Sequence, residues 1–120
     1  MSRKISLYLN DILKSCRKII TYTEGMTYEV FLQDDRTYEA VLLNLQIIGE
    51  SVKNIPDEIR DRSPEIEWRK IAGLRDLIAH AYFQIESGIV WDIIQTKIQP
   101  LQQAVSQLIQ LPQTTDRRED

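Results

Sequence analysis

LRDLIAHAY, residues 74–82, is the stretch of sequence that decides the fold. Within and around it, apolar residues recur at intervals of three and four, at Ile71, Leu74, Ile78, Ala81 and Ile85. Such intervals place side chains on one face of a helix, which turns by about 100° per residue. By the same rotation Arg75, His80 and Tyr82 lie off this apolar face, so solvent or a partner can reach them.

Two long helices are predicted before this stretch. The first is expected to run to about Tyr22, with an apolar face made of Ile5, Leu9, Ile12, Cys16 and Ile19. A short helical turn is expected within residues 26–32. The second is expected to begin at the capping pair Asp34-Asp35 and to end at Pro56, with an apolar face made of Val41, Leu45, Ile48, Val52 and Ile55.

Two further helices complete the prediction. Ser63-Pro64-Glu65 has the residue types of a helix start, because serine caps, proline suits the first position and glutamate complements the dipole. This third helix contains the stretch quoted above and is expected to reach Phe83, with Ser87-Gly88 separating it from the last helix. The apolar face of the last helix comprises Val90, Ile94, Ile98, Leu101, Val105 and Leu108. Pro100 within it predicts a kink or break near Ile98-Gln99.

These patterns predict an all-α protein, an antiparallel bundle of four long helices with additional short helical segments. No stretch shows the alternation of a strand. A length of 120 residues fits one domain, which we place at residues 1–111, with a disordered polar tail at 112–120. Gly49, inside the second helix, indicates close approach of another backbone.

Composition and charge narrow the classes of function. A net charge of -3 argues against coating nucleic acid through bulk positive charge. The single cysteine, Cys16, has no internal disulfide partner and lies on an apolar face, which predicts a buried, reduced thiol. The first residues do not form a signal peptide, and no apolar run reaches membrane-spanning length. We therefore expect a cytoplasmic protein without a membrane segment.

Counting residues excludes several familiar sites. One histidine and one cysteine cannot build the usual zinc site, and there is no glycine-rich phosphate loop. A di-metal carboxylate bundle needs Glu-x-x-His pairs, which the sequence lacks. Cys16 and His80 make an improbable thiol protease pair, because Cys16 belongs to a buried face. We therefore predict neither a metal site nor a cofactor.

Arg75 and His80 remain as candidates for chemistry. Histidine exchanges a proton near neutral pH, and arginine offers a planar set of donors to phosphate oxygens. Together they suit cleavage of an RNA phosphodiester without a metal ion: the histidine assists attack by the ribose 2′-hydroxyl or protonates the departing oxygen, and the arginine stabilises negative charge.

Helix geometry places a condition on this hypothesis. Five residues separate Arg75 from His80, so the two lie about 140° apart around an ideal helix, whereas Arg75 and Tyr82 align within about 20°. A shared site then requires a bent arginine side chain, a distorted helix near His80, or a second copy of the chain across a twofold axis.

A simpler interpretation needs no catalysis. On spacing alone, a surface histidine near an arginine is more often a solvated or interface side chain. Tyr82 would lie at the edge of the core, and Asp76 would be a surface partner for His80 one helical turn away.

The spacing Arg75-Asp76, three residues, then His80-Ala81-Tyr82 resembles the Arg-x4-His-x-Tyr signature of HepT toxins in the HEPN superfamily of helical RNases. Supporting features occur in order along the chain over residues 3–110: Asp35 to Val41, Ile48-Gly49-Glu50, Trp68-Arg69-Lys70-Ile71-Ala72-Gly73, Tyr82-Phe83 and Val90-Trp91. The ordered set is more specific than Arg-x4-His alone.

The resemblance implies a HEPN-like helical domain and a homodimer, or a higher oligomer, with the paired motif in its cleft. It implies a metal-independent ribonuclease, with Arg75 and His80 catalytic and Asp76 supporting, acting on RNA with tRNA as a reasonable substrate. It also implies the toxin of a type VII-like toxin–antitoxin system. There an MntA-type nucleotidyltransferase antitoxin transfers AMP from ATP to the motif tyrosine, here Tyr82, and so blocks the RNA phosphate site.

One alternative of a different class stays open. The chain is then a non-catalytic helical module that binds a nucleotidyltransferase and serves as its substrate or regulator. Replacing His80 by alanine separates the two, because only the ribonuclease depends on that side chain.

Overall fold

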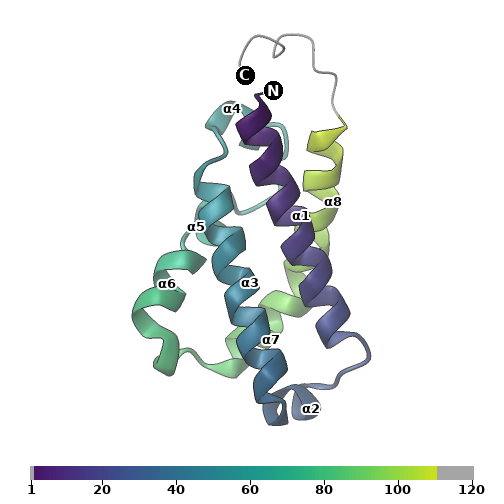
Figure 1. The fold of residues 1–120 in the computed structure, drawn as a ribbon, viewed down its shortest axis with the longest axis vertical. Coiled ribbons are helices and arrows are strands. Elements are labelled where there is room, and N and C mark those ends of the chain that lie inside the picture. Colours follow the sequence, from purple (N-terminus) through teal and green to yellow (C-terminus); the bar gives the residue numbers. More distant parts are fainter. Residues whose placement is uncertain (1, 111–120) are drawn as a thin grey trace.

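The computed structural model describes residues 2–110 and shows a bundle built on two long antiparallel helices (Figure 1). They are α1 (Arg3–Thr23) and α3 (Asp35–Lys53), joined through the short α2 (Tyr28–Gln33). The elements that follow are α4 (Asp57–Arg60), α5 (Trp68–Ala72), α6 (Leu74–Ala81), the 3₁₀ turn η1 (Tyr82–Gln84), α7 (Ser87–Thr96) and α8 (Ile98–Ile109). The predicted tail, residues 112–120, lies outside the described part of the chain.

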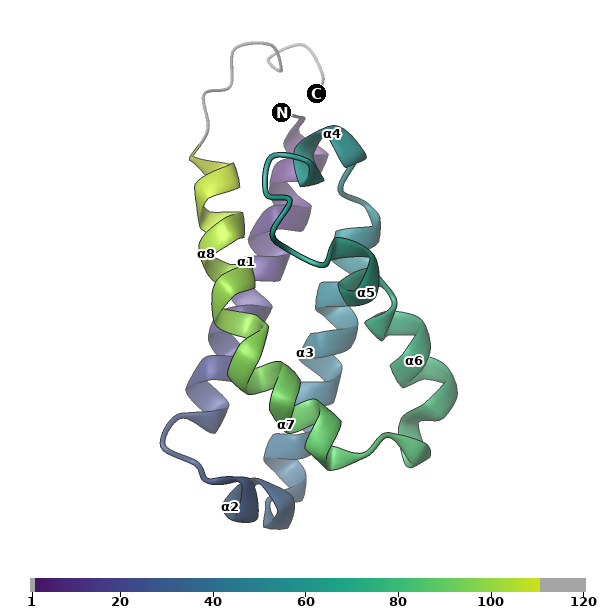
Figure 2. The same cartoon turned by 180° about the vertical axis from the view of Figure 1, so that it is seen from behind.

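The core lies between α1, α3 and α8. Helix α1 packs against both of the others, and α7 crosses the back of the bundle before the chain turns into α8 (Figure 2). The apolar faces predicted from the sequence supply the core, with Leu9, Ile12, Cys16, Ile19, Val41, Leu45, Ile48, Val52, Leu101, Val105 and Leu108 all buried. Among residues 2–110, none of the helices has the length and apolar character needed to cross a membrane.

The ends of the first helices follow from local chemistry. Helix α1 ends just before Gly25, whose φ of +76° favours glycine. Asp34 caps α3 as predicted: its carboxylate accepts hydrogen bonds from the backbone N–H and the hydroxyl of Thr37, at 3.1 and 2.9 Å. These hydrogen bonds lower the pKa of Asp34. The predicted start of the second long helix is therefore confirmed, but this helix ends at Lys53, before the expected Pro56, and the short helix reaches Gln33.

The prediction of one continuous third helix from Ser63 to Phe83 was wrong. The residues after Ser63 form turns, and helix begins only at Trp68. The buried indole of Trp68 explains the difference, because its Nε1–H donates to the carbonyl oxygens of Arg60 and Ser63, at 3.0 and 2.9 Å. Gly73 then separates α5 from α6, and a 3₁₀ turn follows at Tyr82.

The last predicted helix is also divided, as Pro100 suggested. Lys97 separates α7 from α8, slightly earlier than the expected position, and Pro100 lies in the first turn of α8 where a missing N–H does little harm. Ser87-Gly88 does not separate helices as predicted: α7 begins at Ser87, and Ile85 and Glu86 form the connection. The fold is the predicted all-α bundle, with the third and fourth helices each in two pieces.

Candidate active site

The motif stretch forms α6, which lies on the outside of the bundle against α3 (Figure 1). Ile78 is the buried residue of this helix, whereas Asp76 and His80 are exposed. The motif helix therefore has the predicted arrangement, with an apolar face towards the bundle and the polar motif residues off that face. Helix α6 attaches to the bundle by one face and leaves the polar residues of the motif open.

Gly49 allows α3 to approach the start of α6 closely. A methyl group at this position would lie 2.7 Å from the backbone nitrogen of Arg75 and 3.1 Å from the carbonyl oxygen of Ile71. The first distance is shorter than real side chains show and the second is tighter than an ordinary contact, so a larger residue would require the backbone to move. The close approach predicted for Gly49 is confirmed, and it fixes the backbone that carries Arg75.

The Arg75 guanidinium lies between two carboxylates. Its Nε is 3.0 Å from Oε2 of Glu50 on α3, and its Nη1 is 3.2 Å from Oδ1 of Asp76. The arginine side chain is 43% exposed. Among the described residues no hydrogen bond or ion pair uses Nη2, so the guanidinium is held by two carboxylates and keeps donors for a further anion.

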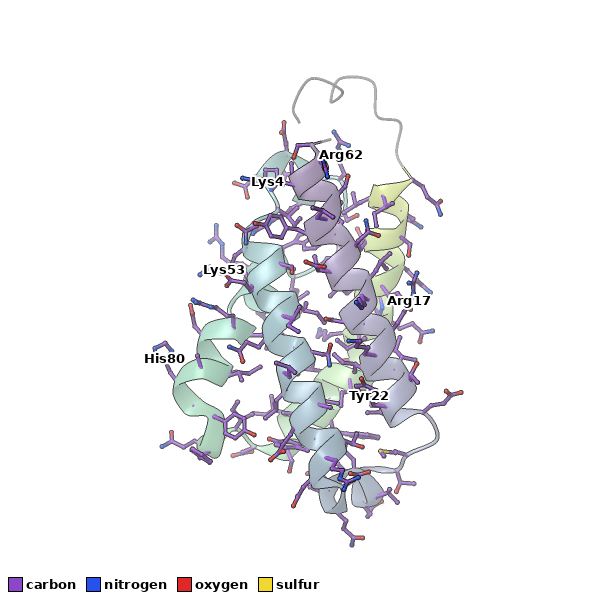
Figure 3. All side chains as sticks on the ribbon, viewed as in Figure 1. Lys4, Arg17, Tyr22, Lys53, Arg62 and His80 are labelled. Atoms are coloured by element: carbon purple, nitrogen blue, oxygen red, sulfur yellow. The ribbon has the colours of Figure 1, made fainter. Side chains whose placement is uncertain are left out.

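The His80 ring is oriented by its own helix. Its Nδ1 lies 2.8 Å from the backbone carbonyl oxygen of Asp76. A carbonyl oxygen only accepts hydrogen bonds, so Nδ1 carries the proton of this contact, and in the neutral ring Nε2 keeps its lone pair. The exposed ring points away from the bundle (Figure 3). His80 thus presents to solvent a nitrogen that accepts a proton.

Tyr82 lies where α6 ends and the 3₁₀ turn begins. Ala81 has left helical geometry, with φ of -130° and ψ of 27°, so Tyr82 is not on the ideal helix that the sequence suggested. The residue is 37% exposed, and its ring meets the ring of Phe83 edge-on, with centroids 5.0 Å apart. Burial raises the pKa of Tyr38 on α3, and the nearby Tyr82 raises it further. The tyrosine of the motif therefore lies close to α3.

Asp76 contacts both Arg75 and His80. Its carboxylate contacts Arg75, and its backbone carbonyl accepts the hydrogen bond from His80. The simpler interpretation named Asp76 as a partner of His80, and the contact in the structure is made by the Asp76 backbone carbonyl. No hydrogen bond or ion pair joins Arg75 to His80 within residues 2–110, which agrees with their predicted separation around the helix.

Sequence reasoning did not predict Glu50 as a partner of Arg75. The available signal was Gly49, because a glycine that brings two backbones together also brings the next side chain on that helix close to the neighbour.

Within the described residues no group of three or more His, Cys, Asp or Glu side chains could hold a metal ion.

Comparisons with known proteins agree with the motif. The family model described as ribonuclease HepT-like matches residues 12–108. A Methanocaldococcus jannaschii protein with a provisional RNase name is 40% identical over 96 residues, which is 80% of this chain and 79% of the relative.

A second relative carries the family name itself. This Thermococcus cleftensis protein, provisionally named ribonuclease HepT, is 39% identical over 101 residues, or 84% of this chain and 92% of the relative. No solved structure matches the chain significantly. The family match and the two relatives confirm the resemblance noted from the sequence, and the chain belongs to the HepT-like ribonuclease family.

Proposed function

We propose that the chain is the toxin of a toxin–antitoxin pair, an endoribonuclease that cleaves RNA by acid–base catalysis without a metal ion. The observation that carries the proposal is the hydrogen bond from His80 Nδ1 to the Asp76 carbonyl. It leaves an exposed Nε2 as proton acceptor. This nitrogen takes the proton of a ribose 2′-hydroxyl, whose oxygen attacks the adjacent phosphorus, or in its protonated form gives a proton to the departing 5′-oxygen.

Arg75 supplies the positive charge in this mechanism. Its guanidinium is held by Glu50 and Asp76, and its remaining donors stabilise the negative charge that develops on the phosphate oxygens. The two carboxylates fix the position of the guanidinium before RNA binds. A positioned donor costs little reorganisation during the reaction.

A homodimer would complete the site, and such dimers could assemble into a higher oligomer. Arg75 and His80 lie about 140° apart on an ideal helix, so one copy of the chain does not direct both at one phosphate. The surface beside Arg75 supports pairing, because Leu43 and Ile47 are exposed next to Arg75 and Glu50 around a hollow of about 340 Å³. Two copies in contact here would place two arginines in one cleft and offset the acidic net charge where RNA binds.

Regulation by a cognate nucleotidyltransferase of the MntA type follows from the exposure of Tyr82. In this proposal the phenol oxygen attacks the α-phosphorus of ATP, pyrophosphate leaves, and AMP remains on the tyrosine. The added group carries negative charge at the end of the motif helix and would hinder binding of the RNA phosphate. The cytoplasm is the compartment in which such a toxin meets its substrate, for which tRNA is the first candidate.

Cleavage of total cellular RNA in the presence of a chelator tests the proposal. Wild-type protein is compared with His80→Ala and with Lys53→Ala, which changes an exposed side chain near the end of α3. Discrete fragments from the wild type and from Lys53→Ala, but not from His80→Ala, support the ribonuclease. Equal cleavage by His80→Ala removes the role of the histidine, and no cleavage by any of the three favours the non-catalytic partner of a nucleotidyltransferase.

A further inference from the structure

A pocket lies beside the motif, between the start of α3 and the turn that follows α6. Its volume is about 450 Å³, within the range of about 300–1,000 Å³ that is usual for small-ligand sites. Asp35, Tyr38 and Glu39 line it from α3, and Tyr82 and Phe83 line it from the 3₁₀ turn. Of these five residues, only Tyr82 has a role in the proposed function, as the site of modification.

The wall of the pocket is fixed on the α3 side. Tyr38 packs against Phe31, with ring centroids 5.7 Å apart, and its hydroxyl donates to the carbonyl oxygen of Ile85 at 3.4 Å. Asp35 and Glu39 are four residues apart on one helix, so their carboxylates occupy neighbouring positions on its surface. Both carboxylates are exposed, and no hydrogen bond or ion pair of the described residues uses either.

The opposite wall is aromatic and open. Phe83 is 95% exposed, although a large apolar ring is costly to leave in water. It stands nearly perpendicular to Tyr82, at an interplanar angle of 80°. Each ring therefore offers a face in a different direction, and an unpaired nucleobase stacks on such a face in proteins that bind single-stranded RNA.

We propose that this pocket binds an unpaired nucleobase of the RNA substrate, preferentially guanine, next to the phosphodiester that is cleaved. The inference rests on the proposed function and adds the base that is recognised. Guanine carries two adjacent donors on its Watson–Crick edge, the ring N–H and the amino group, and a carboxylate accepts from both. Uracil would direct a carbonyl oxygen at the same carboxylates, which disfavours it.

The position of the pocket favours a base of the substrate over other ligands. Tyr82 belongs both to the pocket and to the motif, two residues after His80, so the pocket adjoins the turn that ends the motif helix. The two carboxylates repel a phosphate, which directs the backbone towards Arg75 and the neutral base towards Asp35 and Glu39. A basic side chain of a protein partner would match the charges, but would not require a pocket shared with the motif.

Nucleosides test binding without depending on cleavage, because they contain no phosphodiester. Guanosine, adenosine, cytidine and uridine are titrated into wild-type protein while NMR shifts of the backbone amides of residues 35–39 and 82–85 are followed. We expect guanosine to bind most tightly and to shift both segments. Failure of all four nucleosides to bind, or equal binding of guanosine and uridine, would overturn the proposal and leave the carboxylates to a basic peptide.

Variants assign the preference to the pocket. Glu39→Gln replaces an acceptor by an amide and should weaken guanosine binding at least about tenfold, in the range of one bidentate base contact. Phe83→Leu should weaken binding of every nucleoside that binds the wild type, because it removes a stacking face. Glu58→Gln removes the same charge from α4, at the other end of the molecule from α2 (Figure 1), and should bind guanosine as the wild type does.

Cleavage separates failure of this inference from failure of the proposed function. Oligonucleotides that differ at one unpaired base are incubated with wild type, His80→Ala and Glu39→Gln. Cleavage that requires His80, with a guanine preference lost in Glu39→Gln, supports both proposals. Cleavage that requires His80 with the same base preference in Glu39→Gln overturns the pocket alone. Guanosine binding without cleavage by any protein leaves the pocket as a nucleobase site and overturns the ribonuclease.

Discussion

Arg75 and Glu50 form an ion pair between α6 and α3, with Nε of the arginine 3.0 Å from Oε2 of the glutamate. The pair lies directly beside Gly49, where the two backbones approach closely. Both side chains are about half exposed, at 43% and 52%, so solvent screens their attraction. We therefore regard Glu50 as a positioning residue for Arg75 and not as a major source of stability.

Replacing Glu50 by glutamine should separate these two roles. The free energy of unfolding should change by less than about 1 kcal/mol, as for other exposed ion pairs. The turnover number for RNA cleavage should fall about tenfold while KM changes little, because the guanidinium loses its orientation in the transition state. Urea denaturation and steady-state cleavage measure the two effects.

Glu67→Gln is the matched control for this variant. Glu67 is likewise a half-exposed glutamate in ion pairs, with Lys70 at 2.9 Å and Lys97 at 3.0 Å, but away from the motif. Its replacement should leave the turnover number unchanged. An equal loss of turnover in both variants would refute a specific role for Glu50.

Gly49→Ala should destabilise the protein, although alanine is the better helix former. The added methyl group would meet the backbone nitrogen of Arg75 at 2.7 Å, so α3 and α6 must move apart. Overpacking of this kind costs about 1–3 kcal/mol, which exceeds the gain of up to about 1 kcal/mol from helix propensity. Urea denaturation monitored by circular dichroism gives the difference.

Gly88→Ala provides the comparison for Gly49→Ala. A methyl group there meets only the hydroxyl of Tyr28, at 3.4 Å. We expect this variant to be as stable as the wild type, or more stable by up to about 1 kcal/mol. If Gly49→Ala were also as stable as the wild type, the close packing of α3 on α6 would not constrain this position.

Cys16 should be inert to thiol reagents in the folded protein. Burial raises its pKa to about 12, from 9.0 for an ordinary thiol, so the thiolate that reacts is scarce near neutral pH. The folded state then keeps a proton that the unfolded chain releases at lower pH. The resulting stabilisation is complete below about pH 9 and is lost as the pH rises towards 12.

Comparison with Cys16→Ala isolates this effect. Above about pH 9 the free energy of unfolding of the wild type should fall more steeply with pH than that of the variant. Reaction with an aromatic disulfide reagent should require urea. Parallel pH curves, or rapid reaction of the folded wild type, would argue against a buried thiol.

Tyr82→Phe should escape the antitoxin and remain active. The substitution removes the hydroxyl that would accept AMP but keeps the ring beside Phe83. After incubation with the cognate nucleotidyltransferase and ATP, wild type should gain the mass of AMP and lose RNA cleavage, whereas the variant should show neither change. Mass spectrometry of the intact protein measures the modification, and equal modification of Tyr82→Phe would reassign the site.

Local signals predicted those parts of the fold that depend on neighbours in sequence. The apolar spacing and the Asp34 cap were enough to place α1 and α3. The same kind of signal was misleading at Ser63-Pro64, because the indole of Trp68 binds the carbonyl oxygens of Arg60 and Ser63 and keeps the intervening chain in turns. A buried tryptophan whose single indole N–H is shared by two backbone carbonyl oxygens outweighs a favourable cap sequence, and periodicity does not reveal that competition.

In the candidate site, too, the sequence identified residues that share one short stretch but not the contacts that depend on packing. Arg75, His80, Asp76 and Tyr82 could be selected from the sequence because they share one short stretch, and their roles stay predictions. Glu50 could not be assigned to Arg75, because the two meet only through the packing of α3 against α6. The contact between His80 and the Asp76 backbone also depends on a side-chain rotamer, which residue spacing does not determine.

The chemical form of the RNA ends tests the central claim most directly. Fragments made by the wild-type protein in chelator are purified and their ends identified by mass spectrometry. If His80 assists attack by the ribose 2′-hydroxyl, the upstream fragment ends in a 2′,3′-cyclic phosphate and the downstream fragment begins with a 5′-hydroxyl. A 3′-hydroxyl paired with a 5′-phosphate would mean that water attacked the phosphorus, and would contradict the mechanism proposed for Arg75 and His80.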